Sequence, residues 1–541
     1  MLQVITGKAG TGKTALLMQM IADEMNKGKR SILVVPEQYS HQAERELCGL
    51  CGSKVSLYAE VLTFTGLARW VDRQLGSGEP VTLDKGGQLL CMALAVDMVY
   101  SQLRVYGGAR KRAAMQNQLL DAVTELKTAC ISQEELLRAA GDCDGLLGDK
   151  LHDLALVYGA YDVVVSGGRA DPTDKLTRLA ERIGDADMGD IRIFVDGFTD
   201  FTGQQLRVLE ALLESGCEIT VCLTCDVEQY ANEVYAISRS TLHRLERIAE
   251  NYNAQWKVIE KKSSHEETAL EFFCDRMFTY SRDRMEDTEN RIRLFAGESV
   301  AEECEFAAAQ AISFVRDHGC RWRDIAIAVR GFEGYETLLD SAFRKYGVPL
   351  YMTKKTPLIA KPLAQMIEAA YEIVMGGWDA EDMFVYLRTG LTGMEAADCD
   401  VLENYVLLWD LRGNAWTKET DWSLHPRGYE KEKTPEDYAV LRRVNVLRRS
   451  VATPLAAFAE ATKAANTGHE QVMALVQLLE TVGADGVLAE RALGLTEAGY
   501  PQQAAECEKI WEMTLCALEQ FDICDHILIA HQLDRVVLVN N

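Results

Sequence analysis

Glycines, a lysine and a threonine near the start of the chain have the spacing of a phosphate-binding loop. The segment GKAGTGKT fits the pattern GxxxxGK[ST] and follows an apolar, strand-like run. In this pattern the glycines turn backbone amides towards phosphate oxygens, and the helix that follows adds its positive dipole end. The lysine would reach the β- and γ-phosphates, and the threonine hydroxyl would hold Mg²⁺. The residues expected to bind ATP here are Gly7, Lys8, Ala9, Gly10, Thr11, Gly12, Lys13 and Thr14. The alternative is a loop that no longer binds nucleotide.

A second motif places an acid at the end of an apolar strand. In IRIFVDGF, Asp196 is expected to hold Mg²⁺ through water, although a lone acid after a strand is often a turn residue. A glutamate next to such an aspartate normally activates the attacking water. Gly197 stands there instead, and the next acid is Asp200. The two motifs together predict ATP binding with weak or absent hydrolysis.

Two further sets of residues are weaker candidates. Arg330, at the end of the strand-like DIAIAVR, is either a sensor of the γ-phosphate across a domain cleft or a surface arginine. Phe64, Thr65 and Trp70 in VLTFTGLARW either contact single-stranded DNA by stacking and hydrogen bonding or belong to the core.

The cysteines allow a metal hypothesis, which is the less favoured one. Two CxxC pairs occur, Cys48/Cys51 and Cys222/Cys225, and a zinc site would need them to meet in space. No histidine pattern supports such a site. Fifteen cysteines scattered through a long chain without a disulfide spacing indicate reduced thiols in a cytoplasmic protein.

Composition limits the classes of partner. The formal net charge is −25, so the chain is not expected to bind DNA by charge alone, and any contact with DNA must be local or shared with a partner. No uninterrupted apolar run reaches the ~20 residues of a membrane helix, and we expect a soluble protein without membrane contact.

The elements that must position these residues are strands and helices in alternation. LQVIT, SILVVP, IRIFVDGF and CEITVCLTCD are predicted strands, and residues 13–26 form a predicted helix. A second helix begins at a capping box, Thr202 with Gln205. Between the second and third of these strands, residues 80–183 have only helical periodicity. A parallel sheet with a helical insertion is therefore expected.

A further α/β block follows the segment EKKSSHEET, which is the best linker candidate. RIRLFAG, DIAIAVR and VPLYMT are predicted strands separated by two helices. From Trp378 onward the sequence is mostly helical. It ends in HQLDRVVLVNN, a strand-like segment that predicts a longer polypeptide.

The predicted fold class is α/β, with a RecA-like P-loop domain containing a helical insertion, followed by a second RecA-like α/β domain with a mostly helical insertion. The predicted domains are residues 1–78 and 188–288 for the P-loop domain, 79–187 for its insertion, 289–376 for the first part of the second domain and 377–541 for the second insertion.

These segments resemble the core of superfamily 1 helicases, and more closely the AddB subunits of bacterial AddAB ATP-dependent helicase/deoxyribonucleases. The segments that carry the resemblance are GKAGTGKT, ILVVPEQYSHQAERE, KLHDLALVYGAYD, IFVDGFTDFTGQQLRVLEALL, DIAIAVR and LENYVLLWDLRGNAWTK. The resemblance covers nearly the whole chain and weakens beyond about Trp422.

The resemblance implies double-strand break processing for homologous recombination, in a heterodimer with an AddA-type subunit that acts on double-stranded DNA ends and single-stranded DNA. The chain departs from the family pattern in three ways. It lacks an adenine-reading glutamine upstream of the loop, the glutamate after Asp196, and the family's C-terminal part with its arginine finger, nuclease motif and iron–sulfur cysteines. A 4Fe-4S cluster is therefore expected only in the full-length family member, and this chain alone is expected to lack nuclease activity and a complete ATPase site. An autonomous P-loop ATPase or kinase and a non-catalytic scaffold are the alternatives.

Overall fold

The computed structural model describes residues 1–52, 55–78, 82–108, 112–166, 170–226, 233–262, 268–277, 279, 281–286, 291–352, 358–429 and 432–539. Within these ranges the side chains of residues 56, 502 and 522–539 are excluded. The chain divides into two compact units, which are described separately. The first comprises Met1–Cys225, Ile237–Lys261 and Pro357–Asn541, and the second Asp226–Ala236 and Lys262–Thr356.

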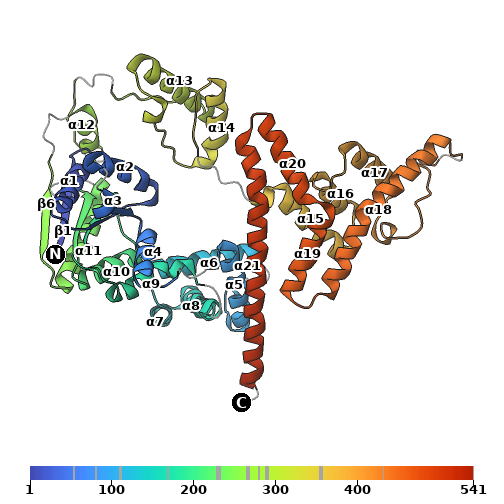
Figure 1. The fold of residues 1–541 in the computed structure, drawn as a ribbon, viewed down its shortest axis with the longest axis horizontal. Coiled ribbons are helices and arrows are strands. Elements are labelled where there is room, and N and C mark those ends of the chain that lie inside the picture. Colours follow the sequence, from blue (N-terminus) through green and yellow to red (C-terminus); the bar gives the residue numbers. More distant parts are fainter. Residues whose placement is uncertain are drawn as a thin grey trace. The chain divides into compact units, whose positions relative to one another are not determined.

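A six-stranded parallel sheet forms the core of the N-terminal part of the first unit (Figure 1). Its order is β3-β2-β4-β5-β1-β6, so the chain leaves β1 on one side for β2 and returns on the other side for β6. Such a change of direction is a topological switch point, where α/β sheets bind ligands at the carboxyl ends of the strands. The strands are β1 (Leu2–Gly7), β2 (Ser31–Val34), β3 (Ala59–Leu62), β4 (Arg192–Val195), β5 (Glu218–Thr224) and β6 (Trp256–Glu260).

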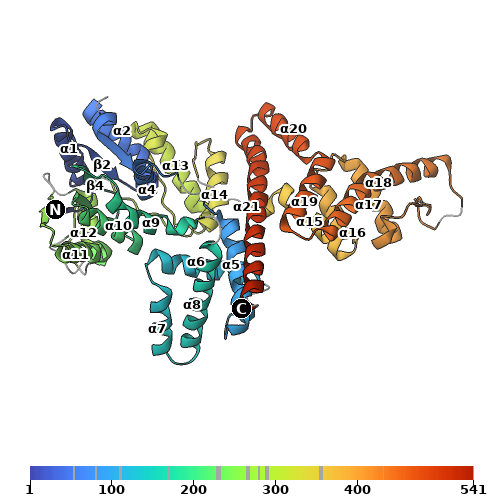
Figure 2. The same ribbon diagram turned by 60° about the horizontal axis from the view of Figure 1, so that its bottom comes forward.

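The four strands predicted for this sheet are confirmed, and their apolar runs are largely buried, as parallel strands covered on both faces require. All six residues of β1 are buried, and β1 pairs with β5 and β6 in register, with Val4 opposite Val221 and Val258. Helices α1 and α2 cover one face, and α10 and α11 lie on the other (Figure 2). The helices around the sheet are α1 (Lys13–Asn26), α2 (Ser40–Cys51), α3 (Val55–Tyr58), α4 (Phe64–Gln74), α10 (Gly203–Glu214) and α11 (Ala236–Asn251).

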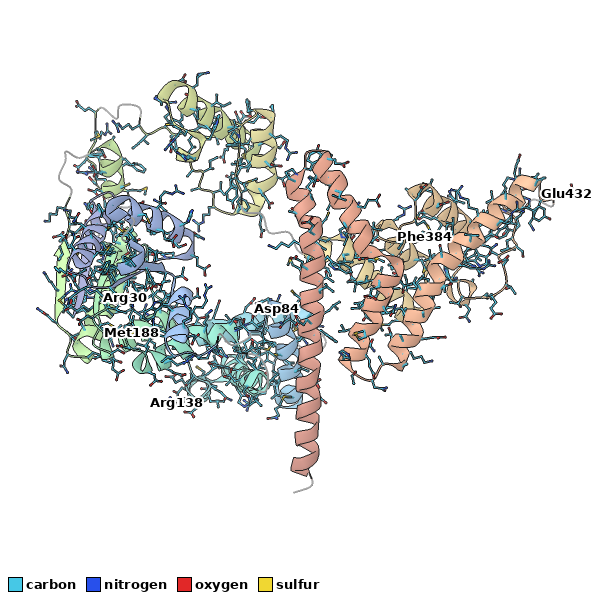
Figure 3. All side chains as sticks on the ribbon, in the orientation of Figure 1. Arg30, Asp84, Arg138, Met188, Phe384 and Glu432 are labelled. Atoms are coloured by element: carbon cyan, nitrogen blue, oxygen red, sulfur yellow. The ribbon has the colours of Figure 1, made fainter. Side chains whose placement is uncertain are left out.

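The insertion between β3 and β4 is helical, as its periodicity predicts. Its helices pack around a core of their own that includes Cys91, Leu120 and Tyr161. Asp84 caps the first of them by accepting a hydrogen bond of 2.7 Å from the amide of Gly87 (Figure 3). The helices are α5 (Lys85–Val99), α6 (Ala113–Thr128), α7 (Gln133–Asp142), α8 (Gly145–Ser166) and α9 (Lys175–Arg182).

The C-terminal part of the first unit is also helical. Its core holds Trp416 and Trp422, whose rings meet at 69° with their centroids 5.3 Å apart. The predicted final strand in HQLDRVVLVNN is wrong, since this segment continues a helix to Val539, and its apolar residues fit either period. The helices are α15 (Pro362–Gly376), α16 (Ala380–Arg388), α17 (Ala396–Trp409), α18 (Pro435–Ala464), α19 (Gly468–Val482), α20 (Ala484–Glu497) and α21 (Pro501–Val539).

Two observations bear on the limits of this helical part. Helix α15 shares its core with α16 to α19, although the sequence-based boundary at residues 376 and 377 separates α15 from them. None of the described helices by itself has the length and apolarity to cross a membrane, and only α19 and α20 taken together, bent by 53°, reach that composition.

The second unit contains helices but no paired strand among its described residues. Helices α13 (Val300–His318) and α14 (Phe332–Lys345) pack through Cys304, Leu339 and Phe343, and α12 (Ala269–Arg276) precedes them. The three predicted strands RIRLFAG, DIAIAVR and VPLYMT are not formed in their described residues. The apolar residues of 325–329 and 348–352 instead line an open groove of about 700 Å³ beside the helix pair. An apolar run becomes a strand only where another strand pairs with its backbone.

Candidate nucleotide-binding site

The loop between β1 and α1 lies at the carboxyl edge of the sheet, at the switch point. Gly10 and Gly12 have φ of +77° and +81°, a backbone conformation that residues other than glycine rarely adopt. The Thr11 hydroxyl donates a hydrogen bond of 2.9 Å to the carbonyl of Lys8 and closes the loop on itself. Helix α1 begins at Lys13, so its free amides face the loop. The structure thus has the strand–loop–helix arrangement on which the phosphate-binding prediction depends.

Lys13 is buried beneath this loop. Its Nζ donates a hydrogen bond of 2.7 Å to the carbonyl of Lys8. Burial lowers the pKa of Lys13, and the nearby Cys222 and Asp196 oppose this shift. Among the described residues, the carbonyl of Lys8 is the one hydrogen-bond partner of this ammonium, and a buried ammonium with so few partners gains much from an anion placed beside it.

Asp196 follows β4 and lies within electrostatic range of Lys13. Its Oδ1 accepts a hydrogen bond of 2.8 Å from the amide of Gly197, whereas Oδ2 is buried and has no partner in the described part of the chain. Burial raises the pKa of Asp196, and the neighbouring Thr14 hydroxyl lowers it. Oxygen ligands of this kind suit Mg²⁺. Thr14 and Asp196 therefore fit a magnesium ion, which would use the unpartnered oxygen.

The position after Asp196 has no acid, and the next acid is occupied elsewhere. Gly197 contributes no side chain, and its φ is +84°. Asp200 accepts hydrogen bonds of 2.9 Å from the Thr241 hydroxyl and 3.1 Å from Arg244. Asp200 thus fixes α11 to the segment after β4. The site has groups of the kind that phosphate loops use for a nucleotide. Gly197 has no carboxylate to activate water, and that of Asp200 is bonded to α11.

The residues predicted to contact DNA lie on α4. Phe64 and Trp70 are buried, with 5% and 3% of their surface exposed. Phe64 packs edge-to-face on Phe198, with the ring centroids 5.5 Å apart, and the Trp70 indole donates to Glu60 at 3.2 Å. Bases could stack on these two rings only if this packing opened. The hydroxyl of Thr65 is 2.8 Å from that of Thr63, and the DNA contact stays a prediction.

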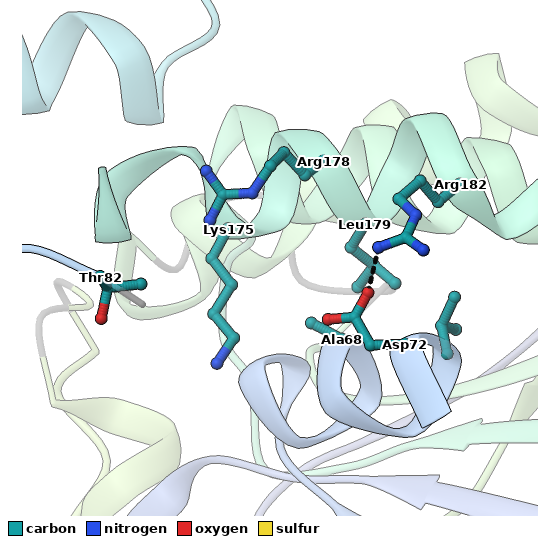
Figure 4. Close-up of a pocket in the computed structure, with 8 residues that line it drawn as sticks. Ala68, Asp72, Thr82, Lys175, Arg178, Leu179 and Arg182 are labelled. Carbon is teal, nitrogen blue, oxygen red and sulfur yellow. Dashed lines mark hydrogen bonds and ion pairs between the residues drawn. The ribbon is translucent and has the colours of Figure 1, made fainter. Parts of the chain in front are cut away.

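A small pocket beside α4 is basic. It has a volume of about 50 Å³ and lies between α4 and α9, with Lys175, Arg178 and Arg182 on the α9 side (Figure 4). Arg182 forms an ion pair with Asp72 of α4 across it. The volume of the pocket is far below the ~300 Å³ of a typical small-molecule site, so a nucleotide does not fit there.

The remaining predicted residues are dispersed. Arg330 is exposed and belongs to the second unit, so its role at the γ-phosphate stays a prediction. Cys222 and Cys225 are buried beside the phosphate loop, and the Cys222 thiol donates to the carbonyl of Lys13 at 3.8 Å. Cys48 and Cys51 lie at the end of α2.

Lys261, which follows β6 at the same edge of the sheet, is a candidate site residue that the sequence does not predict. The segment EKKSSHEET is predicted to be a linker, and its residues 263–267 lie outside the described residues. The available signal was WKVIE, a short segment in which three apolar residues stand beside the charged Lys257 and Glu260, as an exposed edge strand allows.

Comparisons with known proteins point to one family. The family model described as "ADDB, N-terminal" matches residues 4–273. Proteins named as B subunits of ATP-dependent helicase/deoxyribonucleases align with nearly the whole chain. The chain is 29% identical to that of Ruminiclostridium cellulolyticum over 544 residues, covering 96% of this chain and 47% of the relative.

Other relatives give the same result. The chain is 27% identical to the corresponding protein of Acetivibrio thermocellus over 539 residues, covering 96% of this chain and 46% of the relative. It is 30% identical to that of Heliobacterium modesticaldum over 552 residues, covering 96% of this chain and 45% of the relative. The chain spans about half the length of the curated relatives it matches. Together with the family model, these alignments along nearly its whole length show that the chain belongs to the AddB family of ATP-dependent helicase/deoxyribonuclease B subunits.

Proposed function

We propose that this chain binds magnesium-bound ATP at the loop of residues 7–14 and hydrolyses it weakly or not at all. The observation that carries the proposal is the pairing of an intact phosphate loop with Asp196, whose Oδ2 is unpartnered among the described residues, next to a glycine. The loop amides and Lys13 would bind phosphate oxygens, and Thr14 with Asp196 would hold Mg²⁺. The metal would neutralise phosphate charge.

The chain's own residues favour binding over turnover. To reach a phosphate, the Lys13 ammonium exchanges its bond with the carbonyl of Lys8 for an anionic partner, which is a favourable exchange in a buried site. Turnover also requires a base that orients and deprotonates water. Gly197 offers none, and Asp200 is bonded to α11. Bound ATP would therefore persist and stabilise one conformation of the sheet domain.

At the level of the family, we propose that the chain is the helicase-like part of a protein that works with an AddA-type partner on DNA ends during homologous recombination. The names of the relatives support this proposal, since they describe one subunit of an ATP-dependent helicase and deoxyribonuclease. The bound nucleotide would act as a structural ligand of the protein, and the partner would supply the motor activity. Arg330 remains a candidate for a contact with the γ-phosphate.

The test compares the parent chain with Lys13→Ala. Binding of ATP and ADP is measured by calorimetry with and without Mg²⁺, and hydrolysis is measured with and without single-stranded DNA. We expect ATP binding by the parent, loss of at least about tenfold in affinity for Lys13→Ala, and turnover near background. Lys257→Ala, which changes an exposed lysine on β6, is the matched control and should bind like the parent.

Two results would contradict the proposal. Rapid, DNA-stimulated hydrolysis that disappears in Lys13→Ala would show that the site is a working ATPase. Absence of any nucleotide binding by the folded parent would favour a scaffold that uses the helicase fold without its ligand.

A further inference from the structure

The chain immediately after β6 is fixed against the phosphate loop. The amide of Lys261 donates a hydrogen bond of 2.7 Å to the carbonyl of Thr6, the residue before the loop. Its carbonyl oxygen lies 2.4 Å from the position that a Cβ on Gly7 would occupy. Gly7 must therefore be glycine for β6 to end where it does. The amide of Lys261 is thus bonded to the end of β1, and its carbonyl passes close to the first residue of the loop.

The side chain of Lys261 lies along the same loop. Its Cε is 4.0 Å from the position that a Cβ on Gly12 would occupy, and Gly12 directly precedes Lys13. Within the described ranges, no carboxylate or carbonyl pairs with its ammonium group. The Lys13 ammonium, by contrast, is already bonded to the carbonyl of Lys8. A second cation with no protein partner thus lies over the part of the loop where phosphate is expected.

The charge balance of the site explains the use of such a cation. A nucleoside triphosphate brings up to four negative charges into a chain whose formal net charge is −25, beside the carboxylate of Asp196. Lys13 alone leaves much of that charge uncompensated. An ammonium on a flexible stem, anchored at its backbone, can reach phosphate oxygens without moving the sheet.

We propose that Lys261 is a second phosphate-binding lysine of this site and contacts the part of the polyphosphate held by the loop around Gly12. The inference rests on the proposed nucleotide binding. The amides of a phosphate loop cradle the α- and β-phosphates, so Lys261 acts on phosphates that ATP and ADP share. It raises the affinity for both nucleotides and does not discriminate between them.

The experiment measures ATP and ADP affinity of the full chain by calorimetry in the presence of Mg²⁺. Lys261→Met should lower the affinity for ATP and for ADP by about tenfold, which is the effect of losing one charge-assisted hydrogen bond. Lys261→Arg keeps the charge and should bind within about twofold of the parent. Lys257→Met removes an exposed lysine four residues earlier on β6, about 13 Å away along the strand, and should change nothing.

Each outcome separates this inference from the proposed function. If the parent binds ATP, Lys13→Ala does not, and Lys261→Met binds like the parent, Lys261 has no role and the proposed function stands. If Lys261→Met loses affinity for ATP alone, the lysine contacts the γ-phosphate and the assigned position is wrong. Failure of the parent to bind either nucleotide overturns both. Circular dichroism and thermal melting without nucleotide check that Lys261→Met folds like the parent. If Lys261→Arg does not keep the parent's affinity, the loss in Lys261→Met comes from packing, and the inference is overturned.

Discussion

Gly197 shows how a single backbone conformation can remove a chemical function. Its φ is +84°, and a Cβ there would lie 3.0 Å from Cδ of Pro36. Any side chain at this position would be strained by the backbone and crowded by the proline ring. The missing glutamate is therefore a property of the local fold around Pro36 and Tyr39, and a simple substitution does not restore it.

The first prediction separates the cost of backbone strain at Gly197 from the cost of its contact with Pro36. Gly197→Ala and Gly216→Ala both place an alanine at a φ of +84°, but nothing lies within 4 Å of the Cβ position on Gly216. Gly216→Ala should cost about 1 kcal/mol in the free energy of unfolding, the strain of the backbone alone. Gly197→Ala should cost about 1 kcal/mol more, because Pro36 must shift. Urea denaturation measures both, and equal losses would refute the contact argument.

The second prediction concerns the missing acid. Gly197→Glu restores the residue type of a hydrolysing site, yet it should not raise ATP turnover, because the strained backbone prevents a productive carboxylate position. The variant should also be destabilised by about 1–3 kcal/mol. A steady-state ATPase assay at saturating ATP tests it, and a clear gain in turnover by a stably folded variant would show that the glutamate alone was lacking.

The third prediction follows from the raised pKa of Asp196. Mg²⁺ binds the ionised carboxylate, so Mg²⁺-dependent ATP affinity should fall as the pH falls through this pKa, above the ~3.9 of an ordinary aspartate. Asp196→Asn should lose this pH dependence and at least about tenfold in Mg²⁺-dependent affinity. Calorimetry between pH 5 and pH 8, within the range of protein stability, measures the slope of each protein.

Although Asp196→Asn should weaken Mg²⁺-dependent ATP binding, it should not lower the stability of the protein without ligand. Burial disfavours the ionised carboxylate of Asp196 in the folded state, and this destabilisation is fully present above its folded-state pKa. Removing the charge should therefore leave the free energy of unfolding at neutral pH unchanged or raise it by about 1 kcal/mol. Asp190→Asn, at an exposed position before β4, is the control. A strongly destabilised Asp196→Asn would indicate a structural carboxylate instead of a ligand.

At the scale of elements, one buried lysine joins the helices of the insertion. Lys127 of α6 contacts Asp162 of α8 at 2.7 Å, and it contacts Asp171 at 3.0 Å and Asp174 at 2.9 Å in the turn before α9. Burial alone would lower the pKa of Lys127, but the three carboxylates raise it above the ordinary value. The ammonium is therefore charged, and it holds three segments that are separated in sequence.

The fourth prediction is that Lys127→Met destabilises the helical insertion by about 3–5 kcal/mol, because it leaves the buried carboxylate of Asp171 without its cation. Lys85→Met is the matched control, since it breaks an exposed ion pair between Lys85 of α5 and Asp121 of α6 and should cost less than about 1 kcal/mol. Thermal melting followed by circular dichroism compares the two. Equal effects would mean that the buried cluster contributes no more than a surface pair.

The elements of the sheet domain could be predicted because their signals are local. The apolar runs of β1, β2, β4 and β5 and the capping box of Thr202 and Gln205 each occupy a few consecutive residues, and the structure confirms them. The strands expected in the second unit depend on partners that the pattern of a single segment cannot supply. Edge strand β6 was missed because exposed Lys257 and Glu260 interrupt its apolar pattern.

The site could be predicted only in part for a similar reason. Lys13, Thr14 and Asp196 come from motifs whose chemistry depends on short spacing, and the structure brings them together. Lys261 reaches the loop only through the pairing of β6 with β1, across about 250 residues of sequence. The burial of Phe64 and Trp70 likewise depends on packing against distant segments, which the spacing of VLTFTGLARW does not encode.

At the scale of the whole molecule, the acidic net charge opposes contact with nucleic acid. The net charge of −25 opposes the phosphate backbone, and the basic groups beside α4 are few and partly paired. The fifth prediction is that the chain alone binds single-stranded and duplex DNA with a Kd of about 1 µM or weaker at roughly 150 mM salt. Fluorescence anisotropy at several salt concentrations measures this, and nanomolar binding without a partner would contradict it.

The position of β1 between β5 and β6 has a consequence for how the protein is made. This strand is synthesised before the other five strands of the sheet, but both of its neighbours come much later, since β5 begins at Glu218 and β6 ends at Glu260. At about 5–20 residues per second, the ribosome needs on the order of ten to fifty seconds to supply them. During that interval an apolar strand waits unpaired while the local helices of the insertion can already fold. Stalled nascent chains of increasing length should therefore gain protease resistance in the insertion first, and in residues 1–7 only after β6 has emerged.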